Sequence, residues 1–250
     1  VRCDVRAPSD AGGSRLVTVH LTGFGPFGGV TDNPTSIVCR VVEQLVRSGS
    51  TPAGVEPSLL DEFKASGVRV EGFECLEVSA KAVHAALPGI VSGLASSPDA
   101  GSACAIVHMG VSGGSTRLHL ECRGHNVADF RIPDVQGWQP RGTAIFDGAP
   151  QHLYTDLALP QILGELHDRG VDCAISTDPG RYICNYTFYA SLHEAGPVGI
   201  PVLFVHLPLF EQMDEAAQVK AILCLIMAIA RQLRGEPPTD GASSTTRPLG

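Results

Sequence analysis

The sequence is poor in aromatic residues and in positive charge. Aromatic residues make up 6% of the 250 residues, and 18 lysines and arginines stand against 26 aspartates and glutamates, for a formal net charge of −8. Nucleic-acid backbones and anionic membranes both require a basic face on the protein that binds them. We therefore expect neither nucleic acid nor a membrane as a partner. The 44% hydrophobic content with so few aromatic rings predicts an aliphatic core.

Hydrophobic runs long enough to cross a membrane are also missing. The nearest candidate, residues 221–230, is about half the required length and lies between Lys220 and Arg231. It predicts a buried helix near the C-terminus. The first residues contain no apolar segment of the kind that a secretory signal needs. We therefore expect a cytoplasmic protein whose eight cysteines are reduced rather than joined in a disulfide framework.

Apolar runs alternate with helical patterns along the chain. The runs predict strands at residues 16–21, 68–78, 104–109, 173–175 and 202–205. Apolar spacings of three and four residues predict helices over residues 34–45, 79–94, 160–170 and 214–233, the second interrupted by Pro88 and Gly89. This alternation indicates a layered α/β domain with a largely parallel sheet, without an internal repeat or a second domain.

Composition suggests the boundaries of this domain. Residues 1–14 are rich in Gly, Ser and Pro and are expected to form a flexible arm, and residues 235–250 a disordered tail. The folded domain is then residues 15–234. Within it, residues 47–66 are polar and contain Pro and Gly, which predicts a surface insertion.

Cys184 is the strongest candidate for a catalytic residue. The strand at residues 173–175 leads into a Pro-Gly turn and then into a helix whose first residues include Cys184. A helix N-terminus carries partial positive charge and free N–H donors, and a thiol placed there has its thiolate form favoured. The turn is expected to aim Cys184 at the carboxyl edge of the sheet, where ligands of open α/β sheets bind. The alternative is an ordinary buried helix cysteine.

Two further residues complete a possible catalytic group. His206 ends the apolar run 202–205 at what we expect to be the same edge, and with Cys184 it forms the standard pair of nucleophile and base. Glu121 lies in an extended stretch in which Leu118 and Leu120 share the opposite face. Such a carboxylate usually faces solvent, but it could accept the second ring N–H of His206 and orient the imidazole.

A glycine-rich tract follows the first strand. Residues 23–28 match the G-x-G-x-x-G pattern of dinucleotide loops. The following helix starts at Pro34, several residues too late for its N-terminus to hold a pyrophosphate, and Pro26 would crowd the approach. We expect instead that Phe24 and Phe27 are exposed and offer a surface for a small, flat, uncharged ligand.

Histidines and cysteines between residues 104 and 125 could be read as metal ligands. Their spacing fits neither paired C-x-x-C nor H-E-x-x-H patterns. We therefore expect no metal site.

Several segments together resemble one known family. In chain order they are 21–29 (LTGFGPFGG) with Asn33-Pro34, 107–114 (VHMGVSGG), 120–126 (LECRGHN), 131–134 (RIPD) with Gly137 and Gln139-Pro140, 178–185 (DPGRYICN) and 204–208 (FVHLP). They are similar to the type I pyroglutamyl peptidases, cysteine aminopeptidases that remove an N-terminal pyroglutamate. The resemblance covers roughly residues 16 to 233.

The resemblance implies a single three-layer α/β/α domain with a twisted, mostly parallel mixed sheet. It also implies a triad of Glu121, Cys184 and His206 and no cofactor. Members of that family range from monomers to tetramers, so the resemblance allows a homo-oligomer. We therefore expect a cysteine exopeptidase that acts on peptides with an N-terminal pyroglutamate through a thioester acyl-enzyme.

The resemblance further implies residues that bind the substrate. Phe24 and Phe27 correspond to phenylalanines that line the pocket of the pyroglutamyl ring. Asn33 corresponds to a residue that holds this loop, and Arg131 to an arginine near the nucleophile.

The chain also departs from the family pattern. Pro179 stands where Ala is usual, and Val111 replaces a Gln of bacterial members, which favours a eukaryotic-type member. Two alternatives remain open: a nucleotide- or phosphate-binding α/β enzyme, and a binding protein that kept the fold without catalysis.

Overall fold

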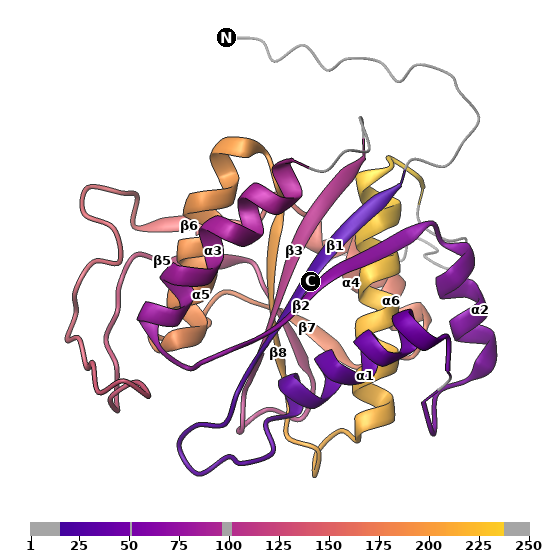
Figure 1. Cartoon of the computed structure of the whole chain (residues 1–250), viewed down its shortest axis with the longest axis horizontal. Coiled ribbons are helices and arrows are strands. Elements are labelled where there is room, and N and C mark those ends of the chain that lie inside the picture. Colours follow the sequence, from indigo (N-terminus) through magenta and orange to yellow (C-terminus); the bar gives the residue numbers. More distant parts are fainter. Residues whose placement is uncertain (1–15, 51, 97–101, 238–250) are drawn as a thin grey trace, which may run out of the picture.

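The computed structural model describes residues 16–50, 52–96 and 102–237. A six-stranded sheet lies between two layers of helices, with α3 and α5 on one face and α1, α2, α4 and α6 on the other (Figure 1). This arrangement confirms the expected α/β/α domain. The predicted arm (1–14) and most of the predicted tail (235–250) lie outside the described residues.

The large sheet is mixed. Its strands, in spatial order, are β2 (Val68–Leu76), β1 (Val17–Phe24), β3 (Ala103–Val111), β8 (Val202–Leu207), β4 (Leu118–Glu121) and β7 (Cys173–Ser176). All neighbours are parallel except β4 and β8, which pair antiparallel. A small antiparallel sheet joins β5 (Arg123–His125) to β6 (His152–Tyr154). The mostly parallel sheet explains why its central strands are apolar on both faces.

The helices largely follow the predicted ranges. They are α1 (Pro34–Ser48), α2 (Pro57–Ala65), α3 (Ala80–Ala95), α4 (Leu159–Asp168), α5 (Ile183–Ala195), the short 3₁₀ helix η1 (Gly196–Val198) and α6 (Glu215–Leu233). The expected interruption of α3 at Pro88 is wrong, because the helix continues through this residue. Packing of Val83, Leu87 and Ile90 in the core offsets the hydrogen bond that proline cannot donate.

Two apolar layers form the core. One lies between the sheet and α1 and α6, and the other lies between the sheet and α3 and α5. Among the described residues α6 is long and apolar enough to cross a membrane, but most of its apolar segment is buried inside the domain. A mostly buried helix of this kind is typical of a core element, as the sequence predicted.

The segment 47–66 is more than a polar surface insertion. It contains α2, which places Leu59, Leu60 and Phe63 in the core next to α6. The low density of apolar residues concealed the helix, because these three side chains occupy one face of a helix of only nine residues. The expectation of a purely surface segment is therefore corrected.

Candidate active site

Cys184 is the second residue of α5, as predicted. The N-cap residue Tyr182 makes no side-chain hydrogen bond to the helix N-terminus. The first backbone N–H groups of a helix have no partner within the helix. Because Cys184 is in the first turn of α5, its thiol lies beside these N–H donors at the positive end of the helix dipole. The residue is partly buried.

The route that brings Cys184 to this place differs from the expected one. Because β7 is parallel to β4 and β4 is antiparallel to β8, the carboxyl ends of β7 and β8 point in opposite directions. The turn after β7 therefore does not lie at the carboxyl edge shared by β1, β3 and β8. Residues 177–182 connect β7 to α5 and place the helix N-terminus at the level of His206.

His206 lies near the end of β8 and is buried. Its Nδ1 atom is 2.7 Å from Oε1 of Glu121, which itself is only 1% exposed. The side chain of Cys184 lies close enough to this ring to raise its pKa. The structure thus brings together three residues that are 63 and 22 positions apart along the chain.

The charge state of His206 follows from these contacts. Burial by itself lowers the pKa of an imidazole. The charge of Cys184 and its hydrogen bond, followed by those of Glu121, outweigh burial and raise the pKa of His206 from 6.5 to about 10. The protonated ring is therefore favoured at neutral pH.

Glu121 reaches His206 because of the antiparallel pairing of β4 with β8. Glu121 lies opposite Phe204, and His119 lies opposite His206, so all four side chains are on the same face of the sheet. Leu118 and Leu120 face the other side and join the core next to α6. The predicted alternation of β4 is confirmed, but its polar face is directed into the protein rather than toward solvent.

Gly110 is a residue that sequence reasoning did not single out. It lies beside His206 in the pairing of β3 with β8. A Cβ atom on Gly110 would lie 2.7 Å from Cζ of Phe204 and 2.9 Å from Sγ of Cys184. The thiol thus occupies space that exists because residue 110 has no side chain. A glycine within an otherwise apolar strand is the signal that could have revealed it.

The two phenylalanines of the glycine-rich tract differ in exposure. Phe24 is the last residue of β1, is 3% exposed, and packs against Phe204 with ring centroids 6.5 Å apart. The expectation that Phe24 is exposed is therefore wrong, because β1 continues to this residue and directs the ring into the core. Phe27 is partly buried and lies against Tyr182, with centroids 6.3 Å apart.

Asn33 fixes the conformation of this loop. Its Nδ2 atom donates to the carbonyl of Gly25 at 2.9 Å, while Oδ1 accepts from the backbone N–H and the hydroxyl of Thr35. The Thr35 hydroxyl in turn accepts from the backbone N–H of Phe24 at 2.9 Å. Asn33 therefore both caps α1, as predicted, and ties the loop to the end of β1. Thr35 completes this network and was not singled out from the sequence.

The same contacts weigh against a dinucleotide loop. The N-terminus of α1 is capped by Asn33, so one of the donors that would hold a pyrophosphate is already used. Gly23 has a different role, since a Cβ atom there would lie 2.5 Å from the carbonyl oxygen of Thr35. This glycine allows close packing of β1 against α1.

Arg131 has an exposed side chain in the segment between β5 and β6. Its backbone carbonyl accepts a hydrogen bond from Nε2 of Gln139. The neighbouring Phe130 packs on Tyr182, the N-cap of α5, with ring centroids 4.9 Å apart. The segment that carries Arg131 therefore lies against the helix start that carries Cys184.

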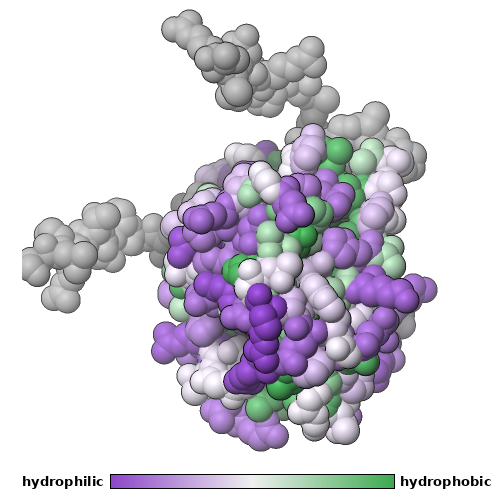
Figure 2. Space-filling view, turned by 90° about the vertical axis from the view of Figure 1, so that its left-hand side faces the viewer, coloured by the Kyte–Doolittle hydropathy of each residue, from purple (hydrophilic) through white to green (hydrophobic). Residues whose placement is uncertain are grey.

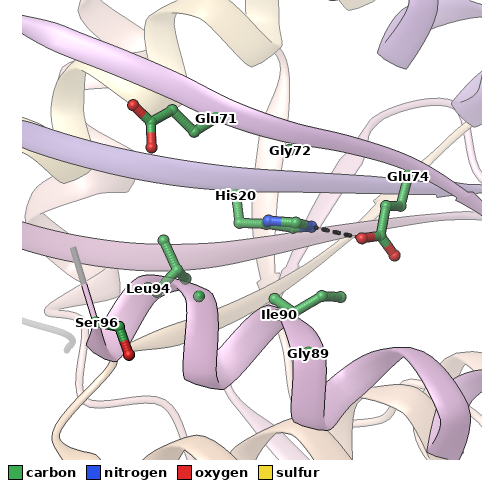
Figure 3. A pocket seen from close by; sticks show the side chains of 9 residues that line it. His20, Glu71, Gly72, Glu74, Gly89, Ile90, Leu94 and Ser96 are labelled. Carbon is green, nitrogen blue, oxygen red and sulfur yellow. Dashed lines mark ion pairs between the residues drawn. The ribbon is translucent and has the colours of Figure 1, made fainter.

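A cavity of about 270 Å³ lies elsewhere in the molecule. Figure 3 shows it between β2 and α3, with the ring of His20 directed toward Glu74. Its lining contains none of the predicted site residues. Within the described ranges, no cluster of three or more His, Cys, Asp or Glu side chains could hold a metal ion.

An α/β fold that carries a cysteine at a helix N-terminus beside a buried histidine–glutamate pair is typical of a cysteine hydrolase. The model of the pyroglutamyl peptidase family matches residues 78–232. Over 193 residues the sequence is 30% identical to the pyrrolidone-carboxylate peptidase of Pyrococcus furiosus, covering 76% of this chain and 80% of that protein. The Klebsiella pneumoniae protein of the same name is 33% identical over 77% and 78% of the two chains.

Solved structures agree with these relatives. A mutant pyrrolidone carboxyl peptidase from P. furiosus superposes with a TM-score of 0.69 at 26% identity, covering 86% of this chain and 99% of that one. The Thermus thermophilus pyrrolidone carboxyl peptidase gives 0.64 at 25% identity, over 85% and 100%. The chain therefore belongs to the pyroglutamyl peptidase family, an enzyme family of cysteine-type omega-peptidases.

Proposed function

We propose that this enzyme hydrolyses the amide bond between an N-terminal pyroglutamyl residue and the next residue of a peptide, with Cys184, His206 and Glu121 as its catalytic triad. One observation carries the proposal: the buried ring of His206 is hydrogen-bonded to Glu121, and Sγ of Cys184 lies over Gly110, the strand neighbour of His206, at a helix N-terminus without a side-chain cap. A nucleophile, a base and an orienting carboxylate are the three groups that this reaction needs.

Acylation is the first half of the reaction. Sγ of Cys184 forms a bond to the pyroglutamyl carbonyl carbon, and the carbonyl oxygen becomes an oxyanion. Backbone N–H groups at the start of α5 face this oxygen and stabilise its charge. The protonated ring of His206 then gives its proton to the leaving nitrogen as the C–N bond breaks. A thioester and a peptide with a free α-amine result.

Deacylation reverses these roles. Neutral His206 takes a proton from a water molecule, whose oxygen attacks the thioester carbon. The C–S bond breaks, and pyroglutamate leaves with the original ion pair of Cys184 and His206 restored. Glu121 accepts the Nδ1–H bond throughout, which keeps Nε2 directed at the sulfur and stabilises the charged ring.

Specificity follows from the chemistry of the lactam ring. Pyroglutamate has no charged α-amine, so an apolar wall can cover its ring without loss of hydration. We assign that wall to Phe27 and Tyr182, which lie against each other, supported by Phe24 from within the core. A free α-ammonium would lose its hydration there without gaining a partner. We also propose that the positive charge of Arg131 lies near the reacting carbonyl.

The test is the release of a fluorophore from a pyroglutamyl amide by the wild type and by Cys184→Ala. We expect the variant to lose at least about 10³-fold in kcat, while Cys75→Ala, which replaces an exposed cysteine of β2, keeps full activity. Activity that survives Cys184→Ala would refute the assignment. No turnover by the wild type, together with thermal stabilisation by nucleotides, would favour the nucleotide-binding alternative.

A further inference from the structure

Asn185 is a buried side chain that the proposed reaction leaves without a role. It follows Cys184 directly as the third residue of α5, and none of its surface is exposed. A buried amide needs partners for its carbonyl oxygen and for its two N–H donors. Asn185 finds these partners on residues 125–127, a segment that starts in β5 shortly after Glu121. Its amide therefore joins the helix of Cys184 to the chain that continues from Glu121.

The amide of Asn185 is bonded on both of its sides. Its Oδ1 atom accepts from the backbone N–H of His125 at 2.8 Å, and its Nδ2 atom donates to the carbonyls of His125 and Val127, both at 2.9 Å. The pairing with His125 through one donor and one acceptor is the pattern that a neighbouring strand would offer. The reverse orientation of the amide would oppose two N–H groups and leave two carbonyls without a donor. The bonds therefore fix both the distance and the direction of the side chain.

Gly124 allows β5 to approach α5 closely. A Cβ atom on this glycine would lie 2.9 Å from Cα of Tyr189 and 3.0 Å from its backbone nitrogen. Tyr189 lies one turn after Asn185 on the same face of the helix, so β5 contacts this face at two successive turns. Figure 2 looks onto this side of the molecule, with α3, α5 and the β5–β6 connection, and shows hydrophobic areas between hydrophilic ones. The contact between α5 and β5 lies beneath that surface, because Asn185 and Gly124 are both buried.

The rotation of α5 about its own axis decides where the thiol points. Successive residues of an α-helix are turned by about 100°, so Cys184 and Asn185 face different neighbours. Sγ of Cys184 lies over Gly110 of β3, 2.9 Å from where a Cβ atom would be, while the amide of Asn185 faces β5. Because both side chains belong to one turn of helix, the bonds of the amide also fix the direction of the thiol.

Other bonds hold the connection that precedes the helix. The carbonyl of Thr177 accepts from Nε of Arg123 at 3.0 Å, and that of Arg181 accepts from the backbone N–H of Asp129 at 3.1 Å. These bonds place the chain as it enters α5. Asn185 acts inside the first turn, where a side-chain bond constrains the rotation of the helix itself.

We propose that Asn185 is a positioning residue, whose three hydrogen bonds to residues 125–127 hold α5 at the rotation that places Sγ of Cys184 beside His206. The proposal rests on the proposed function, because it takes Cys184 as the nucleophile. Loss of these bonds lets the thiol shift, and a misplacement of about 1 Å costs about 10²-fold in rate. The loss falls on kcat rather than on KM, because Asn185 faces β5 and not the substrate.

A displaced thiol also changes the charge state of His206. Burial lowers the pKa of this imidazole, but the side chains of Cys184 and Glu121 together raise it to about 10. When Cys184 moves away, part of this effect is lost and the pKa of His206 falls. Since protonated His206 is the acid of acylation, the alkaline limb of the kcat/KM profile then moves to lower pH. A side chain that served stability alone would leave this limb in place.

The test compares Asn185→Ser with the wild type in the hydrolysis of a fluorogenic pyroglutamyl amide. A hydroxyl group offers one donor in place of two, and the change adds no charge near His206. We expect kcat to fall about 10²-fold, KM to stay within about twofold, and the alkaline limb to move down by about one pH unit. If Asn185→Ser does not fold, Asn185→Asp keeps the size of the side chain and the acceptor for the N–H of His125 but loses both donors. Its kcat should fall by a similar factor.

Asn126→Ser is the matched control. Asn126 belongs to the same segment, and its Nδ2 atom donates to the carbonyls of Phe146 and Ala149. Its Oδ1 atom accepts from the backbone N–H groups of Ile145 and Phe146. The amide thus makes bonds of the same kind, but to the β5–β6 connection instead of α5. Its loss should lower the free energy of unfolding by an amount comparable to that for Asn185, with kcat and the alkaline limb unchanged.

The two serine variants separate positioning from stability. Lower kcat with a displaced alkaline limb in Asn185→Ser alone would support the proposal. Full kcat in a folded Asn185→Ser enzyme, or equal losses of kcat in both variants with the limb unmoved, would overturn it and leave the proposed function intact. No turnover by the wild type would overturn the proposed function itself, and the positioning role with it.

Discussion

Nδ1 of His206 lies 2.7 Å from Oε1 of Glu121, although the two residues are 85 positions apart. The second oxygen of this buried carboxylate has no hydrogen-bond partner among the described residues. The charge of Glu121 is therefore compensated mainly by His206. This dependence couples the orientation and the charge of the imidazole to one buried residue, and it makes the pair sensitive to substitution and to pH.

Removal of the Glu121 charge is expected to reduce catalysis. Glu121→Gln keeps the shape of the side chain but no longer stabilises the protonated ring, and its amide N–H can donate a hydrogen bond to Nδ1 and favour the wrong tautomer. We expect kcat to fall by about 10²- to 10⁴-fold. The measurement is steady-state hydrolysis of a pyroglutamyl amide.

Glu165→Gln is the matched control for this change. Glu165 is also 1% exposed, is bonded through Oε2 to Arg231, and has an unpartnered second oxygen. Its replacement should lower stability without changing kcat of the folded enzyme. Equal losses of kcat in both variants would indicate a general effect of removing buried charge.

Stability should depend on pH through His206. The pKa of this group is about 10 in the folded protein and about 6.5 when unfolded, so the folded state holds the proton more tightly. The stabilising contribution is fully present below pH 6.5 and is lost as pH rises toward 10. Urea unfolding between these pH values should show a steeper decline for the wild type than for His206→Gln. Parallel curves for the two proteins would contradict the prediction.

Gly110→Ala should displace the nucleophile. The added methyl group would lie 2.9 Å from Sγ of Cys184 and 2.7 Å from Cζ of Phe204. We expect a loss of about 1–3 kcal/mol in the free energy of unfolding and a loss of at least about 10²-fold in kcat. Gly114→Ala, in the same tract, would meet no atom within 4 Å and should leave kcat unchanged. A fully active Gly110→Ala enzyme would show that the thiol works from another position.

Asn33→Ala should weaken both a helix cap and a loop contact. The loss of its buried bonds to Gly25 and Thr35 is expected to cost about 2 kcal/mol and to raise KM, because the loop that carries Phe27 is released. Asp214→Ala removes the corresponding cap of α6, an exposed bond to Ala217. This control should lower stability with KM unchanged. Thermal unfolding and KM measured for both variants separate the two effects.

Gly72→Ala should destabilise the edge of the sheet. Gly72 has φ 79°, and a Cβ atom there would lie 2.1 Å from the ring of His20. We expect a cost of at least about 2 kcal/mol. The control is Gly89→Ala. Gly89 lies across the same cavity (Figure 3), and a Cβ atom there would meet no atom within 4 Å. In the helix α3 this change should be neutral or stabilising by up to about 1 kcal/mol. Chemical denaturation compares the two, and similar stabilities would contradict this account of Gly72.

Local patterns predicted most of the elements correctly. Asn33 followed by Pro34 marks a helix start, and the capping bond of Asn33 is present. The alternation of Leu118 and Leu120 in β4 also held, because side-chain direction in a strand depends on the backbone alone. These features are decided by neighbouring residues and do not require knowledge of the fold.

Other features depended on partners that are distant in the sequence. No local sequence pattern indicated that β4 pairs antiparallel with β8. The turn after β7 was therefore expected at the carboxyl edge of the sheet, whereas the structure brings Cys184 to His206 through the connection 177–182. Phe24 was expected to be exposed because it belongs to the glycine-rich tract, but the pairing of β1 with β2 extends to Phe24 and Leu76, and the ring is buried. Pro88 was expected to break α3, but the helix is held by its buried face.

By itself, the sequence determined that a thiol would start a helix and that a histidine would end an apolar strand, because caps, turns and periodicity are local properties of the chain. Only the tertiary structure decided that Glu121 meets His206 and that Gly110 leaves room for Sγ of Cys184. Such distances are set by the order and direction of the strands, which depend on how the whole chain buries its apolar surface.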